Sequence, residues 1–467
     1  MAAGTISKYR MHTLKRANLA LQRFYGAPNL RNITLETFKR DQLSIRTYPN
    51  LSKCDMNAVQ RHMIVLRPDL IQPAEIIEAA RIKLAGAEII EDAAAGEATR
   101  LKLGTKAMLT PEKMAEAVML HNIKNPDNSI ILPVQPSDLA PISLGIRHKL
   151  QYVYDLINLA VSGQHGVKLN PQEVLKSQTT LTILNEETAL PFLREALKYR
   201  HYGLNPERTL FMVQGGGLGM KFENGELVFD TQSKYQLWNH GNMKIQQTLE
   251  GKIFWVRINK QTGEMEKMMV GAGEFREILS KMRNLISYPI EDIDYIEKGS
   301  INLNNLAVAL RLGKQGYRMI MEGVAQKTDP QKGGFFTYDP EKSRVVCVES
   351  DCGGTIINEK DKESLGRIQW LNKNFNNFPE PVNAFDALAS KEFPLHLTVK
   401  GDAIYPQTPQ GDQNFFLRTA FITWEPVQAL RSLKVLQECV PTFLAFKQQD
   451  ERYGFLELAK EYGILPK

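Results

Sequence analysis

From residue 88 onward, short β-rich runs alternate with segments of helical apolar spacing, and this alternation constrains the fold more than any other feature of the chain. Strands separated by helices are typical of a parallel sheet with helices on both faces. The pattern predicts an α/β fold with a doubly wound, mostly parallel sheet, whose ligands lie outside the carboxyl ends of the strands. The expected strands are Glu88–Ala93, Ser129–Leu132, Thr179–Leu184, Thr209–Val213 and Lys252–Ile258.

Helix and hairpin signals support this fold. Thr110 can cap a helix that has Pro111 in its first position. Arg147–Val161 carries an apolar stripe that suits a crossover helix. Two hairpins are expected to interrupt the pattern, one at Met220–Phe229 with a turn at Asn224-Gly225 and one at Phe254–Met269 with a turn around Thr262-Gly263.

We divide the chain into three parts. Residues 1–85 form a helical, basic N-terminal region that ends in an amphipathic helix with Pro73 in its first turn. Residues 86–385 form the α/β domain. Residues 386–467 form a small C-terminal domain, which has a loop rich in Pro, Gln and Gly at Tyr405–Asp412 and a helical tail from Pro426.

The net charge of +6 is concentrated near the N-terminus. Residues 1–67 contain twelve Lys and Arg against Glu36, Asp41 and Asp55, so they contribute +9 and the remainder about −3. Such a region could contact nucleic acid or an acidic membrane, but it lacks RNP-type aromatic residues and helix-turn-helix signals. We expect a solvated helical face instead, and a protein as the partner if residues 1–85 bind one.

What the sequence lacks excludes several classes of protein. No stretch approaches the roughly 20 apolar residues of a membrane span, and no signal-peptide core follows the basic start, so we expect a cytoplasmic protein. The eight histidines show no HExxH pattern, and the cysteines suit neither a CxxC redox motif nor a zinc ribbon. Free thiols are expected at Cys54, Cys347, Cys352 and Cys439.

The first candidate for chemistry follows the expected strand at Glu88–Ala93. The run Ala94–Leu101 contains small residues, which let backbone amides approach a phosphate. Arg100 can hold two phosphate oxygens at once and Lys106 can supply a mobile charge, so together they can offset the charge that develops in phosphoryl transfer. An Ala-rich helix with scattered basic residues is the alternative interpretation.

A second candidate follows Thr209–Val213, where Gln214 precedes three glycines. A glutamine at the carboxyl end of a strand can pair its amide with the edge of a nucleobase, and Gly215 leaves room for the base. Further along, the sequence His240-Gly241-Asn242 could contact ribose or sugar hydroxyls. A hairpin-entry glycine cluster and an ordinary turn are the alternatives.

Taken in order over residues 85–350, these segments resemble the eukaryotic-type UDP-sugar pyrophosphorylases, which include UDP-N-acetylglucosamine and UDP-glucose pyrophosphorylases. Gly96–Lys106 resembles the family's GxGTRLG…PK loop. Tyr202-Gly203-Leu204, which leads to Gln214-Gly215, resembles its YFGL and QQGTLP segments, and His240-Gly241-Asn242 resembles its GHGD loop. The resemblance implies a GT-A-like, Rossmann-type nucleotidyltransferase domain.

The same resemblance implies roles for single residues, with Mg²⁺ as the cofactor and UTP and a sugar 1-phosphate as the ligands. The implied nucleotide-binding residues are Gly96, Thr99, Gln214, Gly215 and Gly241. The implied catalytic residues are Arg100, Lys106 and Lys327, with Lys400 as a further phosphate ligand. The implied sugar-binding residues are Asn242 and Glu349.

Several positions depart from the family's pattern. Glu97 places a carboxylate where phosphates would lie, which costs about one to four kcal/mol at surface-like dielectric unless a cation bridges the two. Asn242 replaces the acid of the GHGD loop, and Asn304-Asn305 replace an Asp-Asn pair. Because magnesium prefers carboxylate and water oxygens, these asparagines weaken the expected metal site.

Three functions are consistent with these residues. The first is a uridylyltransferase that joins UTP and a sugar 1-phosphate into a UDP-sugar and pyrophosphate, with catalysis by positioning and electrostatics. The second is a UTP- or UDP-sugar-binding protein that keeps the fold with weak or no catalysis. The third is a nucleotidyltransferase with a different acceptor, such as a protein side chain.

Overall fold

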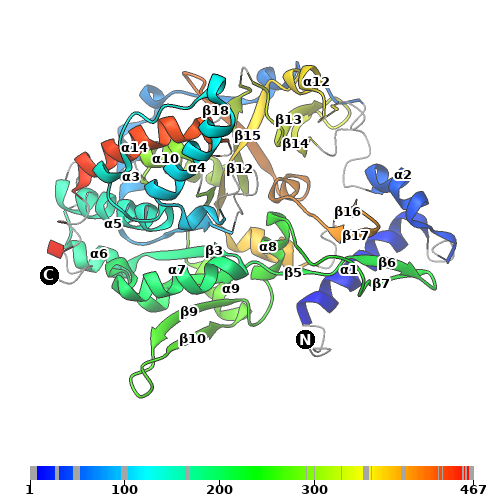
Figure 1. The fold of residues 1–467 in the computed structure, drawn as a ribbon, viewed down its shortest axis with the longest axis horizontal. Coiled ribbons are helices and arrows are strands. Elements are labelled where there is room, and N and C mark those ends of the chain that lie inside the picture. The colour runs from blue at the N-terminus through cyan, green and yellow to red at the C-terminus, as the bar shows by residue number, and fades with distance from the viewer. Residues whose placement is uncertain are drawn as a thin grey trace.

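A large mixed sheet with helices on both faces forms the body of the molecule in the computed structural model (Figure 1). Most of the expected strands and helices are present within a residue or a few of their expected bounds. The structure describes residues 8–26, 31–45, 53–95, 104–163, 166, 168–290, 292–298, 300–327, 329–350, 357–358, 360–390, 396–429, 431–433, 435–454, 457 and 460–461.

Within these residues, twelve strands form one sheet of order β1-β18-β12-β15-β11-β2-β3-β4-β9-β10, with the β13–β14 hairpin beside β15. Pairing is parallel along β11-β2-β3-β4 and along β12-β18-β1, whereas β15 and β9 run antiparallel to their neighbours. The predicted α/β class with a mostly parallel, doubly wound sheet is therefore confirmed. The strands are β1 (Ile64–Leu66), β2 (Glu88–Ala93), β3 (Thr179–Leu184), β4 (Thr209–Val213), β9 (Ile253–Ile258), β10 (Met265–Val270), β11 (Asn284–Pro289), β12 (Met319–Ala325), β13 (Gly334–Asp339), β14 (Arg344–Glu349), β15 (Trp370–Pro379) and β18 (Thr419–Trp424).

Side chains of successive strand residues point to opposite faces of this sheet. Ile89 and Leu285 point to the face packed by α8, α9 and α13, which we call the α8 face. Ile90 and Tyr288 point to the face packed by α4, α5, α10 and α14, which we call the α5 face, and α3 and α11 extend it over β12 and β18. The helices are α3 (Pro73–Leu84), α4 (Pro111–Lys124), α5 (Leu144–Ser162), α6 (Pro171–Ser177), α7 (Glu186–Lys198), α8 (His240–Gln247), α9 (Ala272–Ser280), α10 (Ile293–Lys298), α11 (Leu303–Lys314), α12 (Lys362–Gly366), α13 (Val382–Ala389) and α14 (Cys439–Tyr453).

The N-terminal helices α1 (Lys8–Tyr25) and α2 (Leu35–Ile45) lie beside a second, four-stranded sheet (Figure 1). Its order is β16-β17-β6-β7. Apolar residues of α1 and α2 pack there in a separate core. Arg16 is buried and donates to the backbone oxygen of Leu388 at 3.2 Å, so part of the basic charge holds α1 in place. These strands are β6 (Met220–Glu223), β7 (Glu226–Phe229), β16 (Leu397–Lys400) and β17 (Ala403–Pro406).

The local sequence signals have clear outcomes. The hairpins β6–β7 and β9–β10 are confirmed, as is the Thr110 cap, whose Oγ1 accepts from Lys113 N at 3.4 Å. The expected strand at Ser129–Leu132 is wrong, because the side chain of Asn122 pairs with both the N–H and the C=O of Ile130, each at 2.8 Å, and occupies backbone groups that a strand would use.

The N-terminal and C-terminal regions both contribute to the main sheet. The region before residue 85, expected to be helical, contains β1, which pairs in parallel with β18 from the C-terminal region. The boundary at residue 385 falls within α13. The three-part division stays a prediction. None of the helices in the described part of the chain is long and apolar enough to cross a membrane.

Candidate functional site

The carboxyl ends of the parallel strands β2, β3 and β4 meet at one edge of the sheet, where ligands of such folds bind. Ala94 N donates to Ile183 O at 2.9 Å, and Asn185 Nδ2 donates to Ala95 O at 3.1 Å. Gln214 N donates to Leu184 O at 2.6 Å. The segment that follows β2 and the segment that follows β4 therefore flank the end of β3.

The expected phosphate loop begins at this edge. Ala95 is the last described residue before it, and Gly96, Thr99 and Arg100 lie in residues 96–103, outside the described residues. The chain is described again from Gly104, and Lys106 opens a short 3-10 helix, η5 (Lys106–Met108), that contacts α5 and α7. The structure thus shows where the loop starts and ends, and the roles of its three residues stay predictions.

Gln214 and the glycines after it pack against the segment that leads into α8. The side-chain amide of Gln214 donates to the backbone oxygen of Trp238. Gly215 N donates to Gln246 Oε1 in α8 at 3.1 Å. A Cβ on Gly217 would lie 2.6 Å from the Trp238 ring, so only glycine allows this approach. The sequence-predicted residues Gln214 and Gly215 are therefore brought together with α8 and the segment that precedes it.

Gly241 and Asn242, in the first turn of α8, face the Pro- and Gln-rich segment that follows β17. A Cβ on Gly241 would come within 2.2 Å of Thr408 O and 2.4 Å of Pro409 O. Asn242 is 1% exposed and its Nδ2 donates to Pro406 O at 3.1 Å. Both residues fix this segment to α8, and no described contact tests the predicted role of Asn242 at a sugar.

Glu349 lies next to a residue that the sequence reasoning missed. Gly334 pairs with Glu349 across β13 and β14, and a Cβ on Gly334 would lie 3.0 Å from Glu349 Oε1 and 3.4 Å from Asn372 Cβ. A Cβ on Gly411 would lie 4.0 Å from Asn372 Nδ2. Gly411 belongs to η10 (Gln410–Phe415), which continues the segment packed on Gly241. Glu349 and Asn372 thus lie near η10, which also contacts α8.

The backbone at this point of β15 is strained. Asn374 has a φ of +65°, which is uncommon for a residue other than glycine. Asn372 and Asn374 exchange two hydrogen bonds, both of 2.9 Å, and the pairing of β12 with β15 is irregular between Met321 and Gly323. Strain of this kind concentrates at ligand sites. The signal was present in the sequence, because Asn372, Asn374, Asn376 and Asn377 crowd a strand, where asparagine is depleted.

The three candidate lysines lie on separate elements. Lys106 is in η5, between α5 and α7. Lys327 follows β12 and its ammonium forms an ion pair with Glu438 at the start of α14, so a phosphate would compete with this carboxylate. Lys400 ends β16 in the four-stranded sheet and its side chain is exposed. Their assignment to phosphates stays a prediction.

Two acids that the sequence reasoning missed follow β11. Asp292 and Asp294 are both buried, and Asp294 N donates to Asp292 Oδ1 at 2.9 Å. Lys373 Nζ lies 3.0 Å from Asp294 and 3.2 Å from Glu322. Burial raises the pKa of Asp292 to about 7, since the attraction of Lys373 is opposed by Asp294 and Glu322. The sequence signal that could have identified them is the pair of acids directly after the β11 strand.

The asparagines expected on the metal side lie apart. Asn242 belongs to α8, whose Lys244 and Gln247 bind Glu91 on the α8 face. Asn304 lines a cavity whose floor includes Glu88 and Ile90, on the α5 face. Asn305 Oδ1 accepts from Asn377 Nδ2 at 2.7 Å, so this oxygen is already engaged.

The described residues also offer no ready magnesium site. They contain no group of three or more His, Cys, Asp or Glu side chains arranged to hold a metal. Of the residues expected to replace the family's acids, Asn242 uses its amide to bind Pro406 O, and Asn304 lies apart from it on the α5 face. The described part of the chain therefore does not fit the metal that the resemblance implies.

Solved structures with a similar fold are UDP-sugar pyrophosphorylases. The UDP-N-acetylglucosamine pyrophosphorylase of Trypanosoma brucei matches with a TM-score of 0.53 and 11% identity, covering 94% of this chain and 85% of that chain. An Entamoeba histolytica structure assigned as a UDP-N-acetylglucosamine pyrophosphorylase matches with a TM-score of 0.50 and 13% identity. The match covers 84% of this chain and 87% of that chain. A UDP-glucose pyrophosphorylase of Leishmania major gives a TM-score of 0.48 at 11% identity, covering 93% and 79%.

At these identities the likeness shows the fold, and the fold expected from the resemblance is confirmed. No protein-family model and no curated protein sequence matches the chain.

Proposed function

We propose that this chain, which has the fold of the UDP-sugar pyrophosphorylases, is a uridylyltransferase that joins UTP and a sugar 1-phosphate. In this reaction an oxygen of the sugar phosphate attacks the α-phosphorus of UTP. The bond to the β-phosphate breaks, and pyrophosphate leaves with the electron pair. The observation that carries the proposal is the junction of Gln214 and Gly215 with α8 at the carboxyl edge, beside the start of the loop after β2.

Base recognition follows from the orientation of Gln214. Because its Nε2 donates to Trp238 O, the side-chain oxygen is turned away from Trp238. That oxygen can accept the N3–H of uracil, a donor that cytosine lacks at this position. Gly215 has no side chain to block the approach of the ring to the backbone. This arrangement supports uridine over cytidine nucleotides.

The sugar is proposed to lie beyond η10, toward Glu349 and Asn372. Glu349 is partly exposed and supplies an acceptor for sugar hydroxyls, and the Asn372–Asn374 pair holds the adjacent part of β15 in place. The Glu349 and Asn372 side chains flank Gly334, where a Cβ would lie 3.0 Å from Glu349 Oε1 and 3.4 Å from Asn372 Cβ. Arg100, Lys106 and Lys327 are proposed to offset the charge of the phosphates. The described residues do not fit a magnesium ion, so these cations are the proposed source of charge compensation.

A pyrophosphate-release assay tests the proposal. The purified protein is mixed with UTP, magnesium and either glucose 1-phosphate or N-acetylglucosamine 1-phosphate. We expect release with at least one sugar phosphate and far less with CTP. Arg100→Ala should lower kcat/KM by about 100-fold, because it removes a cation from the developing charge, whereas the surface variant Arg276→Ala should change it less than twofold. Absence of release with every sugar phosphate contradicts the proposal.

A UDP-sugar-binding protein without turnover is the second candidate. The ion pair of Lys327 with Glu438 and the poor fit to magnesium in the described residues favour it. Calorimetric titration with UTP and with UDP-N-acetylglucosamine separates the two candidates. Binding without pyrophosphate release supports the binding protein. If the protein shows no binding and no pyrophosphate release, both candidates are contradicted.

A further inference from the structure

The glycine segment after β4, Gly215–Gly217, packs closely against its neighbours. Part of it forms β5 (Gly216–Gly217), which pairs antiparallel with β8 (Gln236–Leu237). A Cβ on Gly216 would lie 2.4 Å from Gln236 O, so this pairing requires glycine. Glycine also has the most backbone freedom to lose when a segment is ordered. Contacts that order the glycine segment before a ligand arrives therefore favour binding.

Arg10, in the first turn of α1, binds this glycine segment. Its Nε donates to Gly216 O at 3.2 Å. Its guanidinium also lies over the ring of Tyr235, 5.6 Å from the ring centroid. From α8, Gln246 Oε1 accepts from Gly215 N at 3.1 Å. Side chains of two helices, α1 and α8, thus engage backbone groups of two successive glycines.

Tyr235 extends the contact of Arg10 to α7. Its hydroxyl donates to Glu186 Oε1 at 3.1 Å. Glu186 is the first residue of α7 and follows Asn185, the N-cap whose Nδ2 donates to Ala95 O at 3.1 Å. Burial and Glu186 raise the pKa of Tyr235 and Arg10 opposes this rise, as expected for three groups in contact. Through this chain of contacts, α1 is connected to the start of the expected phosphate loop as well as to the glycine segment.

Further contacts hold α1 in the position that Arg10 needs. Asn18 Nδ2 donates to Leu227 O of β7 at 3.0 Å, and Leu227 N donates to Asn18 Oδ1 at 2.7 Å. Arg16 donates to Leu388 O of α13 at 3.2 Å. Figure 1 shows α1 beside β5 and the β6–β7 hairpin. The helix is therefore fixed by side chains at three positions along its length.

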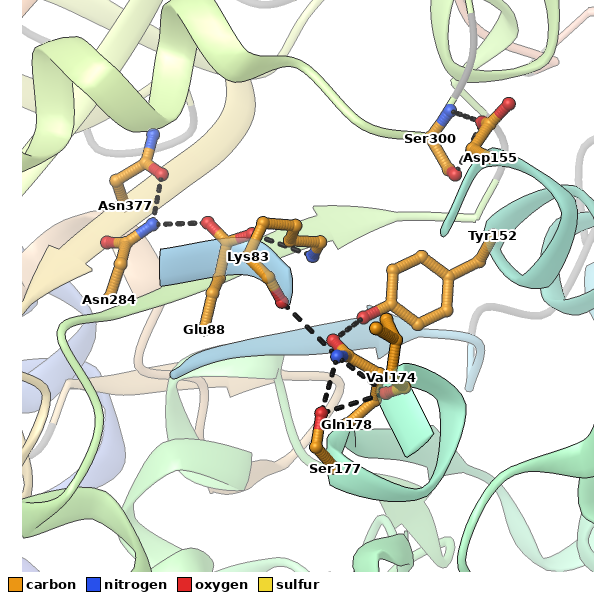
Figure 2. Close-up of polar contacts among 10 residues, drawn as sticks. All are labelled: Lys83, Glu88, Tyr152, Asp155, Val174, Ser177, Gln178, Asn284, Ser300 and Asn377. Carbon is orange, nitrogen blue, oxygen red and sulfur yellow. Dashed lines mark hydrogen bonds and ion pairs between the residues drawn. The ribbon is translucent and has the colours of Figure 1, made fainter. Parts of the chain in front are cut away.

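The amino ends of the parallel strands are held in a different way (Figure 2). Glu88 begins β2 and accepts from Lys83 Nζ and from Asn284 Nδ2, both at 2.8 Å. Gln178, directly before β3, accepts from Tyr152 OH at 2.9 Å and donates to Lys83 O at 3.2 Å. All of these partners come from the main sheet and the helices packed on it. At the carboxyl edge, by contrast, the glycine segment takes one of its partners from α1.

We propose that Arg10 is a positioning residue of the nucleotide site. Its guanidinium holds the carbonyl of Gly216, and α1 thereby orders the segment that the base approaches. Because an ordered segment loses less conformational entropy when the ligand binds, this contact strengthens nucleotide binding and leaves the chemical step unaffected. The inference rests on the proposed uridine site at Gln214 and Gly215. It gives the basic N-terminal region a role in nucleotide binding.

Arg10→Ala tests the proposal in the full-length protein. The variant should raise KM and Kd for UTP about fivefold, because one hydrogen bond from a charged donor is lost, while kcat at saturating UTP stays within about twofold. Pyrophosphate release gives KM and kcat, and calorimetry gives Kd. An unchanged Kd overturns the proposal. A fall in kcat with an unchanged KM also overturns it, since that result would place Arg10 at the reacting phosphates.

Arg10→Lys separates positioning from charge. Lysine keeps the positive charge but lacks the planar donor group that reaches Gly216 O across the Tyr235 ring. This variant should therefore bind UTP as weakly as Arg10→Ala. Full recovery of UTP binding with lysine would show that charge alone is needed, and would overturn the positioning role.

Two further variants of α1 are matched controls. Asn18→Ala removes two contacts with β7 and should lower the midpoint of thermal unfolding, with the Kd for UTP within about twofold of the unmodified protein. Arg23→Ala, at an exposed position in the last turn of α1, should change neither quantity. If Asn18→Ala weakens UTP binding as much as Arg10→Ala does, Arg10 only helps to dock α1, and the proposal is overturned.

Hydrogen–deuterium exchange of the ligand-free proteins gives a readout that does not depend on the nucleotide. Arg10→Ala should speed exchange at Gly215–Leu218 relative to the unmodified protein and to Arg23→Ala, because the glycine segment opens more often. Unchanged exchange there overturns the proposal. If the unmodified protein binds neither UTP nor UDP-N-acetylglucosamine, the uridine site itself is contradicted, and this inference with it. If the unmodified protein and Arg10→Ala bind UTP equally tightly, this inference alone is contradicted.

Discussion

Two glutamates on one strand, Glu91 and Glu88, show how the two faces of the sheet differ. Glu91 accepts from Lys244 at 2.5 Å, from Gln247 at 2.6 Å and from Ser287 at 2.6 Å, and it is 1% exposed. Glu88 also has a lysine and an amide as partners, but it borders the cavity of about 570 Å³ that Asn304 also lines. The α8 face is therefore closed around its charges, whereas the α5 face leaves a space beside them.

The ion pairs on the two faces also have different surroundings. On the α8 face, the buried pair of Glu91 and Lys244 anchors the helix that holds Gly215 and the segment after β17. On the α5 face, Asp294 and Glu322 share Lys373 beside an open volume, and Arg431 lies 3.5 Å from Asp294. Breaking a buried ion pair by removing one partner is costly, because the other charge is left buried without compensation.

The largest effect is expected from Lys244→Met. It leaves Glu91 charged and buried without a cation, which should lower the free energy of unfolding by about 3–5 kcal/mol in urea titrations. Lys83→Met, on the other face, should cost at least about 1 kcal/mol less, because water in the cavity can solvate Glu88. If Lys244→Met and Lys83→Met lower the free energy of unfolding equally, the two faces do not differ as described. The double variant Glu91→Gln/Lys244→Met is the control, and it should recover most of the stability lost in Lys244→Met.

Asp292→Asn should stabilise the protein at neutral and alkaline pH. The folded-state pKa of Asp292 is raised from 3.8 to about 7, so its carboxyl costs nothing below about pH 4 and destabilises the fold increasingly as pH rises to 7. The full penalty corresponds to roughly 4 kcal/mol, and asparagine keeps the acceptor for Asp294 N. The midpoints of thermal unfolding of the variant and the unmodified protein should diverge as pH rises from 4 to 8. If the difference between the two midpoints does not change with pH, Asp292 does not titrate as described.

Gln214→Ala should weaken uridine binding on the α8 side. Loss of the acceptor for the base should raise the Kd for UTP by about tenfold, which corresponds to about 1.4 kcal/mol, and should narrow the preference for UTP over CTP. The comparison is made by calorimetry with both nucleotides. The midpoint of thermal unfolding is the internal control and should stay close to that of the unmodified protein, whereas a large fall in this midpoint would indicate general misfolding.

Asn304→Ala should have the smallest effect on the proposed reaction. Asn304 lines the cavity on the α5 face, so kcat/KM for pyrophosphate release should stay within about twofold of the unmodified protein. If this variant lowers kcat/KM by tenfold or more, Asn304 contacts the substrates and the separation of the two faces is wrong.

The repeated strand and helix signals made the fold predictable. Periodicity located β2, β3 and β4 at their observed bounds, and the Asn-Gly turn located the β6–β7 hairpin. The strand expected at Ser129–Leu132 failed because a single side chain, Asn122, takes its backbone hydrogen bonds, and such a contact leaves no periodic trace.

The site was predictable only in part. Gln214 and Gly215 could be found because they directly follow a clear strand, and the structure brings them to α8. Asn372 could not be placed, because its neighbours Glu349 and Gly411 are distant in sequence and meet only after β13, β14 and η10 have packed. The buried charges at Lys373 and Asp294 likewise depend on the pairing of strands far apart in the chain.

Hydrogen–deuterium exchange with and without UDP-N-acetylglucosamine tests the central claim most directly, that the nucleotide lies on the α8 side of the edge and apart from the cavity. We expect slower exchange at Val213–Gly217 and His240–Asn242 when the ligand binds, with no change at Asn302–Leu306. Protection confined to Asn302–Leu306, or no protection at either segment of the α8 side at saturating ligand, would contradict the account.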